Sequence, residues 1–398
     1  MLNLSAEARR KLTGRDVICV SSMAYGSMWT RKQRLMTILA EMGNRVLYVE
    51  PAWPIYTSAG DKGSWSSKVE QVKPNLWVLT PRGRFPLARF GFIKNYNLNS
   101  YIGAIKAQAR KLGFSKPLLF TYTPVIHAHS DMKLIEDQIE HSLLVYDCVD
   151  EHAETIGYDD YWKKIVHEMD LSLTRRADVV FVTAKGLYDD RKSLHPHLHW
   201  SPNGADRAHF SKAMLPDTKI PDDLAAIPAP RIGFVGALSD WIDYPLIAQI
   251  ARTYPQYSVT LVGPLKRGLT PADLAGIPNV HFLGRKPLAE LPGYLKGFAC
   301  GINPFQQVGI AEKVNPLKVY EYMAAGVTAI STNMPEVRSL AGVVYVARDR
   351  DDFVKGVGEA VTGVYKPDQV LLAETVRRHD WDAIFTDLLE KTAERITL

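Results

Sequence analysis

Short apolar runs alternate along this chain with stretches of helical periodicity. Asp16–Ser22 and Arg45–Val49 have the length and apolar content of strands, and between them apolar residues recur at helical spacing until Gly43. Continuous apolar runs of this kind are typical of parallel sheets that are covered on both faces. The opening of the chain therefore predicts a βαβ unit.

The same alternation continues to the end of the chain, with one interruption. Residues 207–230 are rich in Pro, Asp and Lys and have no sustained period, so we interpret them as a linker. Further strands are expected at Leu76–Leu79, Pro117–Tyr122, Leu143–Tyr146, Val179–Val182, Arg231–Val235, Ser258–Val262, Val280–Leu283, Cys300–Ile302, Val327–Ser331 and Val343–Val346. Helices are expected at Pro245–Thr253, Leu288–Leu295, Pro316–Ala325, Asp352–Thr362 and Asp380–Thr397.

Two successive βαβ-rich halves predict an α/β protein with two doubly wound, Rossmann-like domains that face each other across a cleft. The expected boundaries are residues 1–206 for the first domain, 207–230 for the linker and 231–378 for the second domain. Residues 379–398 are expected to form a helix that packs back toward the first domain. In such domains ligands bind at the carboxyl ends of the strands, so the functional site is expected in the cleft.

The composition is that of an ordinary folded protein, 46% hydrophobic and 23% charged, which excludes disordered, collagen-like and disulfide-scaffold classes. Cys19, Cys148 and Cys300 each adjoin an apolar run and form no CxxC motif, which predicts buried structural cysteines. No stretch reaches the roughly 18–20 apolar residues of a membrane-spanning helix, and the N-terminus lacks the apolar core of a secretory signal. We therefore expect a cytoplasmic protein.

Charge is distributed unevenly. Residues 1–130 contain 19 Lys and Arg against 6 Asp and Glu, whereas residues 131–398 contain 29 against 37. A basic first third indicates an anionic partner such as a membrane surface, a phosphate-bearing substrate or a nucleic acid. The alternative is a solvated basic face without a partner.

The segment from Asn315 to Gly326, NPLKVYEYMAAG, carries the most specific chemistry. Pro316 suits the first turn of a helix, and the free N–H groups of that turn favour a phosphate. Lys318 adds a positive charge there, and Glu321 lies one turn further on the same face, where its carboxylate can accept hydrogen bonds from sugar hydroxyls. The pair can bind the diphosphate and ribose of a nucleotide, or it can be an ion pair on a helix surface.

This segment resembles the donor-site helix of the GT-B glycosyltransferases, and other segments agree in the same order. The N-terminal WxRxQ with LAxxG and VLYVEP, and YDCVD at 146–150, resemble the group that includes teichuronic-acid-type and other cell-surface polysaccharide glycosyltransferases. Three further segments are also similar to the family: SPNGAD at 201–206 with Phe210, RIGFVGALSDW at 231–241 and HFLGR at 281–285.

The resemblance implies a donor site in the second domain and an acceptor site in the first. By likeness to xanthan-type glucuronosyltransferases, Lys318 binds the diphosphate and Glu321 the ribose. Gly236, whose backbone is expected to approach the pyrophosphate, Lys266 and Arg285 complete the implied donor-binding set.

The catalytic course is left open by a broken motif. Many retaining members carry a Glu eight positions before the ribose-binding Glu, but that position is Lys313 here, and Glu312 is one place off. Asp150, just past a strand, is the candidate general base of an inverting reaction, and its alternative role is a helix N-cap. Relatives read DxHD at this point, whereas this chain has Val149 in place of the His.

Three residues of the first domain are candidates for binding an acceptor. Gly26 permits close approach of the backbone to a phosphate, and its alternative role is a simple turn. Arg31 and Lys32 start a helix and can contact the diphosphate of a lipid-linked acceptor. Their alternative role is a solvated helix face, which we favour slightly for Lys32.

No metal or other cofactor is expected. His195, His197 and His199 alternate without carboxylates nearby in the sequence, so we interpret them as structural. The helix N-terminus and Lys318 are expected to stabilise the leaving diphosphate instead.

The resemblance implies a hexosyltransferase of cell-envelope or exopolysaccharide synthesis. It would move a sugar from a nucleoside diphosphate, UDP above all, to a glycan or polyprenyl-diphosphate-linked acceptor at the cytoplasmic face of the inner membrane. The alternatives are a nucleotide-sugar 2-epimerase of the same architecture and a non-enzymatic nucleotide- or nucleic-acid-binding protein. No nucleic-acid-binding module is recognisable, and no GxGxxG follows the first strand, which argues against a dehydrogenase.

Overall fold

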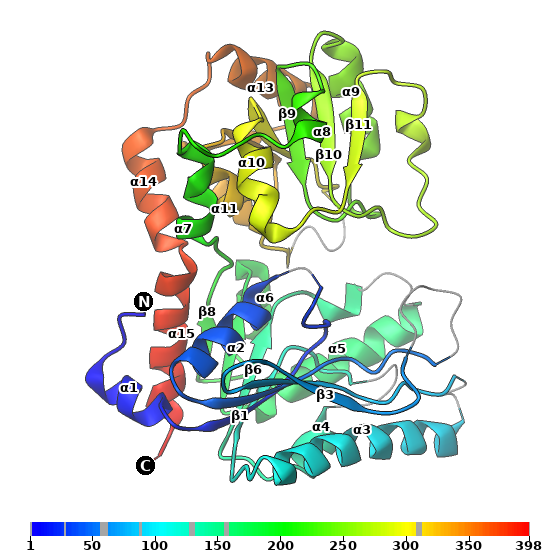
Figure 1. The fold of residues 1–398 in the computed structure, drawn as a ribbon, viewed down its shortest axis with the longest axis vertical. Helices are drawn as coiled ribbons and strands as arrows, with labels where there is room; N and C mark the ends of the chain where they lie inside the picture. Colours follow the sequence, from blue (N-terminus) through cyan, green and yellow to red (C-terminus); the bar gives the residue numbers. More distant parts are fainter. Residues whose placement is uncertain are drawn as a thin grey trace. The chain divides into compact units, whose positions relative to one another are not determined.

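A computed structural model describes residues 2–27, 29–55, 63–86, 90–126, 132–154, 159–307 and 313–397. The chain divides into two units, each built on one sheet (Figure 1). Unit 1 consists of Met1–Ser201 and Phe385–Leu398, and unit 2 of Pro202–Ile384. Within the described residues, no helix combines the length and the apolar character needed to cross a membrane.

The sheet of unit 1 has the strand order β3-β4-β2-β1-β5-β6-β7-β8. All neighbouring strands are parallel except β3 and β4, which are antiparallel. The strands are β1 (Asp16–Val20), β2 (Arg45–Val49), β3 (Lys68–Lys73), β4 (Leu76–Thr80), β5 (Leu118–Thr121), β6 (Leu143–Cys148), β7 (Val179–Val182) and β8 (Leu198–Trp200).

Helices cover this sheet because its central strands are apolar on both faces. One face, which includes Ile18 and Val20 of β1, forms a core with buried residues of α3, α5 and α6. The helices of unit 1 are α1 (Ala6–Leu12), α2 (Arg31–Glu41), α3 (Gly91–Lys111), α4 (Lys133–Glu136), α5 (Asp160–Arg176) and α6 (Lys185–Arg191).

The C-terminal residues of unit 1 lie against its N-terminus, as Figure 1 shows for α1 and α15 (Trp381–Arg395). The Ser5 hydroxyl donates to Glu390 Oε2 over 2.8 Å, and Lys11 Nζ donates to the Ala393 carbonyl over 3.2 Å. These contacts tie the two ends of the chain together within one unit.

The sheet of unit 2 is entirely parallel, in the order β11-β10-β9-β12-β13-β14. Its strands are β9 (Arg231–Val235), β10 (Ser258–Val262), β11 (Val280–Gly284), β12 (Cys300–Asn303), β13 (Ala329–Thr332) and β14 (Val344–Ala347). Its helices are α7 (Arg207–Phe210), α8 (Asp222–Ala225), α9 (Tyr244–Thr253), α10 (Leu291–Lys296), α11 (Leu317–Ala324), α12 (Pro335–Arg338), α13 (Arg350–Thr362) and α14 (Gln369–Arg378), with α15 beginning at its end.

The strands expected from apolar runs are present within one or two residues of their predicted limits. Two strands are additional: in β3 four of the six residues are polar and five are exposed, and β8 has three residues, so neither gives an apolar run. The stretch 207–230 differs from the expected linker, because it contains α7 and α8 and buries Phe210 and Leu224 in the core of unit 2. Helices of four residues are too short to show a period.

The three cysteines are buried and free, as predicted. A buried ion pair lies near Cys148 in unit 1. Arg191 Nη2 contacts Asp170 Oδ2 over 2.7 Å with both side chains fully buried, and Tyr146 donates to Asp170 Oδ1 over 2.8 Å. A buried ion pair of this kind specifies how helices α5 and α6 pack, because neither charge can be left alone in the core.

We expect replacement of Arg191 by Leu to destabilise unit 1 strongly. The variant leaves Asp170 buried without its counter-charge, and the free energy of unfolding should fall by about 3–5 kcal/mol. Urea unfolding followed by a probe in unit 1 measures this change. Lys192→Leu is the control: its pair with Asp189 is exposed, so its loss should cost less than about 1 kcal/mol. Equal effects of the two variants would contradict the structural role of the buried pair.

Candidate functional site

Lys318 stands in the first turn of α11, as the sequence predicted. Its Nζ lies 4.1 Å from the centre of the Phe305 ring and 5.2 Å from that of Phe234. Burial lowers the pKa of Lys318 to about 7, and the nearby negative charge of Glu321 opposes the shift. The ring faces attract the ammonium, but they do not replace the water it has lost. An anion at this helix N-terminus would restore its charge.

Gly236 adjoins Lys318 at the end of β9. Its φ is +146°, and a Cβ added to it would lie 3.2 Å from Lys318 Cε, so the position requires glycine. Behind it, Gly263 has a φ of +149°, and a Cβ there would lie 1.8 Å from the Gly236 carbonyl oxygen. The structure thus brings Gly236 and Lys318 together. The Gly236 N–H, however, donates to the Val262 carbonyl over 2.9 Å, so this glycine provides space beside the lysine rather than a free donor.

Tyr322 fixes α11 to the sheet of unit 2. Its hydroxyl accepts from the Val235 N–H over 2.9 Å and donates to the Ile302 carbonyl over 3.3 Å. A Cβ at Gly301 would lie 2.6 Å from the Tyr322 ring, so a glycine in β12 makes room for it. Sequence reasoning missed this tyrosine, although its spacing of three residues after the apolar Val319 was a signal for the buried side of the helix.

The chain before α11 is held by buried amides. Asn203 donates through Nδ2 to the Asn315 carbonyl over 2.9 Å, and Asn315 donates to Glu336 Oε2 over 2.9 Å. All three side chains are buried. The NGxD segment that marked the resemblance therefore positions the helix that carries Lys318.

Two other predicted donor residues lie in exposed loops of unit 2. Lys266 forms an exposed ion pair with Asp240. Arg285 lies in the turn after β11. Glu321 is partly buried one turn after Lys318, as the helix period requires. The binding roles of all three remain predictions.

Asp150 of unit 1 follows β6 and is partly buried. Among the contacts that the structure describes, no hydrogen bond reaches its carboxylate, and the next element is a three-residue 3-10 helix, His152–Glu154, rather than an α-helix that it could cap. Burial raises the pKa of Asp150 to about 6, and the positive charge of Lys32 opposes the shift. A partly buried carboxylate with this pKa is suited to general base catalysis.

Lys32 corrects one of our interpretations. We favoured a solvated helix face for it, but it is buried, because it lies four and seven residues before the buried Met36 and Leu39 of α2. Its Nζ donates to Ser22 Oγ over 2.7 Å and lies 5.2 Å above the Tyr122 ring. Lys32 is therefore a buried cation near Asp150, and the apolar period of its helix was the signal available for its burial.

Arg31 is buried and engaged inside unit 1. Its Nε contacts Asp147 Oδ2 over 2.7 Å, and its Nη2 donates to Ser201 Oγ over 2.7 Å. These contacts join the start of α2 to the end of β6. They also join it to Ser201, the last residue of the segment Met1–Ser201 of unit 1. The predicted contact of Arg31 with an acceptor stays a prediction.

Gly26 lies in an exposed turn after β1. Its φ is outside the left-handed region, and a Cβ added to it would meet nothing within 4 Å. Neither backbone nor space requires glycine here, so its acceptor role also stays a prediction. Glu312, which bears on the retaining motif, lies outside the described residues.

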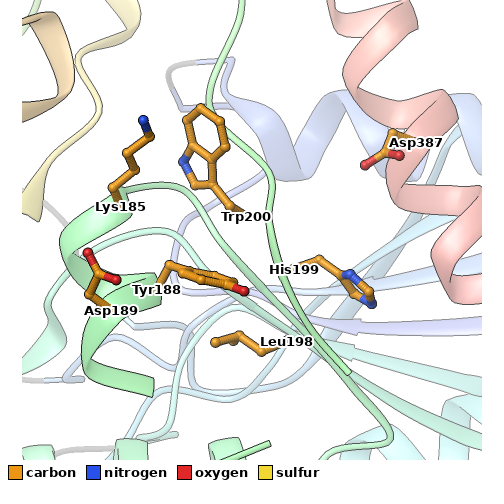
Figure 2. A pocket seen from close by; sticks show the side chains of 7 residues that line it. All are labelled: Lys185, Tyr188, Asp189, Leu198, His199, Trp200 and Asp387. Carbon is orange, nitrogen blue, oxygen red and sulfur yellow. The ribbon is translucent and has the colours of Figure 1, made fainter. Parts of the chain in front are cut away.

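A hollow of about 370 Å³ opens in unit 1 beside the edge strand β8 (Figure 2). Lys185 and Trp200 stand at one side of it, with Lys185 Nζ 5.1 Å from the centre of the Trp200 ring. His199 lies toward Asp387 on the other side, so a carboxylate distant in sequence lines the same hollow as this histidine. No group of three or more His, Cys, Asp or Glu side chains placed to hold a metal occurs in the described part of the chain.

The chain resembles known proteins in sequence and in fold. Residues 229–362, which contain Gly236, Lys318 and Glu321, match the family model described as glycosyl transferases group 1. Over 269 residues the chain is 26% identical to a protein of Bacillus subtilis strain 168 named as a teichuronic acid biosynthesis glycosyltransferase, TuaH. That match covers 63% of this chain and 66% of the relative's length.

Solved structures share the fold over nearly the whole chain. HepE of Anabaena, solved in complex with UDP and glucose, has a TM-score of 0.65 at 12% identity, covering 96% of this chain and 100% of HepE. Sucrose-phosphate synthase of Thermosynechococcus elongatus has a TM-score of 0.64 at 14% identity, covering 96% and 98%.

The two parallel-sheet units and these neighbours define the GT-B fold, which confirms the predicted fold class. The group 1 match within unit 2 and the Bacillus subtilis relative support a glycosyltransferase.

We expect Lys32→Met to raise the pKa of Asp150 further above its ordinary value, because the nearest opposing positive charge is removed from a partly buried carboxylate. Carboxyl-carbon NMR of the titrating Asp150 measures the shift. Lys116→Met, which removes an exposed lysine of the same unit, is the control and should leave the pKa of Asp150 unchanged. An unchanged Asp150 titration in Lys32→Met would show that the two groups are not coupled.

Proposed function

We propose that this glycosyltransferase moves a hexose-type sugar from a nucleoside diphosphate, UDP being the best candidate, to a glycan or polyprenyl-diphosphate-linked acceptor. The observation that carries the proposal is Lys318 in the first turn of α11 beside Gly236, where a cation with a lowered pKa adjoins space made by a glycine. A diphosphate at this point supplies the negative charge that the partly buried ammonium needs. The complex of HepE with UDP and glucose supports UDP as the nucleotide.

Cell-envelope polysaccharide synthesis is the proposed process, and the name of the Bacillus subtilis relative supports it. The basic first 130 residues, with 19 Lys and Arg against 6 Asp and Glu, suit an acceptor attached to a lipid diphosphate. The corresponding location is the cytoplasmic face of the inner membrane. Neither a metal nor another cofactor is needed in this proposal, since Lys318 and the helix N-terminus provide positive charge for the departing diphosphate.

Asp150 is the proposed general base. It accepts the proton of the acceptor hydroxyl as that oxygen bonds to the anomeric carbon and the bond from that carbon to the diphosphate breaks. The carboxylate suits this step because its pKa of about 6 keeps it mostly ionised near neutral pH and still basic enough to take a proton. A single displacement of this kind inverts the configuration at the anomeric carbon.

Incubation with a panel of UDP-sugars, with and without a polyprenyl-diphosphate-linked saccharide, tests the reaction. Release of UDP together with a lengthened lipid-linked glycan is expected. Conversion of UDP-GlcNAc to its 2-epimer without an acceptor would favour the epimerase instead. UDP binding with no turnover of any sugar in the panel would favour a binding protein.

For the donor site, we expect Lys318→Ala to weaken UDP binding at least about tenfold, because a charge-assisted contact to the diphosphate is lost. Isothermal titration calorimetry measures the affinity. Lys355→Ala removes an exposed lysine of α13 in the same unit and should bind UDP like the parent. Retention of parental affinity by Lys318→Ala would remove the phosphate role.

For pH dependence, we expect a bell-shaped profile of kcat/KM. Activity rises as pH increases through about 6, because Asp150 must be deprotonated to act as a base. It falls as pH increases through about 7, because Lys318 loses the charge that binds the donor. Lys318→Arg stays charged and should lose the alkaline limb only, whereas Asp150→Asn should lose turnover at every pH. Full turnover in Asp150→Asn would exclude it as the base.

A further inference from the structure

Unit 1 exposes aromatic rings around the start of α3. Phe92 is 74% exposed and Phe90 is 44% exposed, and their ring centres lie 6.2 Å apart in a stacked arrangement. Tyr96, one turn after Phe92 on the same helix, is 47% exposed. Phenyl rings left this far in water are unfavourable unless another surface covers them.

These rings continue into a second group of aromatic residues from a neighbouring loop. Phe85 lies 5.6 Å from Tyr96 and 6.2 Å from Trp65, which is 58% exposed. Arg82 lies over both Phe85 and Tyr96, with its guanidinium carbon 5.0 and 5.5 Å from the two ring centres. We call Trp65, Phe85, Phe90, Phe92 and Tyr96 the aromatic patch.

The aromatic patch is distinct from the core of unit 1. The later part of α3 buries Leu98, Tyr101, Ile102 and Ile105 against the sheet. Packing of α3 is therefore satisfied without the rings at its start. The most exposed of them, Phe92, lies in the first turn of α3, before the buried residues of that helix begin.

The segment of the chain that carries the aromatic patch is basic. Residues 63–111 contain nine Lys and Arg but a single acidic residue, Glu70. The adjoining strand β3 is exposed and carries Lys68 and Lys73 at its two ends. A protein partner that buried five aromatic rings would also have to match this excess of positive charge over a wide surface, whereas anionic lipid headgroups supply the opposite charge at any position.

We propose that the aromatic patch inserts into the interface of a bilayer that contains anionic lipids. Trp and Tyr favour the boundary between headgroups and acyl chains, Phe adds apolar area below it, and nearby Lys and Arg bind the headgroups. The inference deepens the proposed function, since it places the acceptor-binding unit on the membrane that holds a lipid-linked acceptor. It rests on the proposed function only for that consequence, because binding to lipid requires no turnover.

The test is co-sedimentation of the full chain with vesicles. Vesicles of equal parts phosphatidylglycerol and phosphatidylcholine should bind the protein, and pure phosphatidylcholine vesicles should bind it much more weakly. The double variant Phe90→Ser, Phe92→Ser should lose at least about tenfold in affinity for the anionic vesicles, because two apolar rings no longer insert. Higher ionic strength should weaken binding of the parent, because the headgroup contribution is electrostatic.

Tyr161→Ser is the matched control. Tyr161 is 67% exposed on α5 of the same unit but makes no ring contact to the aromatic patch among the described residues, so its loss should leave vesicle binding unchanged. Equal binding of the double variant and the parent would overturn the assignment of this surface. Absence of parental binding to anionic vesicles, or binding to duplex DNA in preference to them, would overturn the membrane proposal.

A separate measurement distinguishes this proposal from the proposed function. UDP affinity by calorimetry should be the same in the parent and in the double variant, because the aromatic patch belongs to unit 1 and Lys318 to unit 2. Vesicle binding without UDP binding would leave the membrane surface standing and remove the donor assignment. UDP binding without vesicle binding would support the donor assignment and overturn the membrane proposal.

Discussion

A parallel sheet has to be covered on both faces, and this constraint determines where polar chemistry can occur in the protein. Strands such as β1, β6 and β10 are buried at every position. Polar groups are therefore concentrated at the carboxyl ends of strands and in the loops that follow them. Asp150 follows β6 and Gly236 follows β9, so both units place their candidate residues by the same rule.

Asp147 departs from this rule. Asp147 lies within β6 itself and is fully buried. Burial raises the pKa of its carboxyl, and the adjacent Arg31 guanidinium opposes this shift. The charge is tolerated because Arg31 reaches it from α2 and is in turn bound by Ser201. An arginine that looks available for a ligand in the sequence is thus needed by the protein to keep a carboxylate in its core.

Burial acts on the two main candidates in opposite directions. A carboxylate loses stability when its negative charge is desolvated, so the pKa of Asp150 rises to about 6. An ammonium loses stability for the same reason, so the pKa of Lys318 falls to about 7. Both groups titrate near neutral pH for one physical cause, and in each case a nearby opposite charge, Lys32 or Glu321, limits the shift.

The sequence by itself determined the parallel-sheet architecture and the position of Lys318, because buried strands and helix starts leave local patterns of apolar residues and proline. It did not determine β3, in which four of the six residues are polar. Nor did it determine the burial of Lys32, because a lysine is expected in solvent even where the period of its helix places it on the apolar side. Only the tertiary structure could pair Arg31 with Asp147 or set Tyr322 against Gly301, since these partners lie far apart along the chain. Local patterns follow from which face of an element is buried, whereas partners across the fold depend on how distant elements pack.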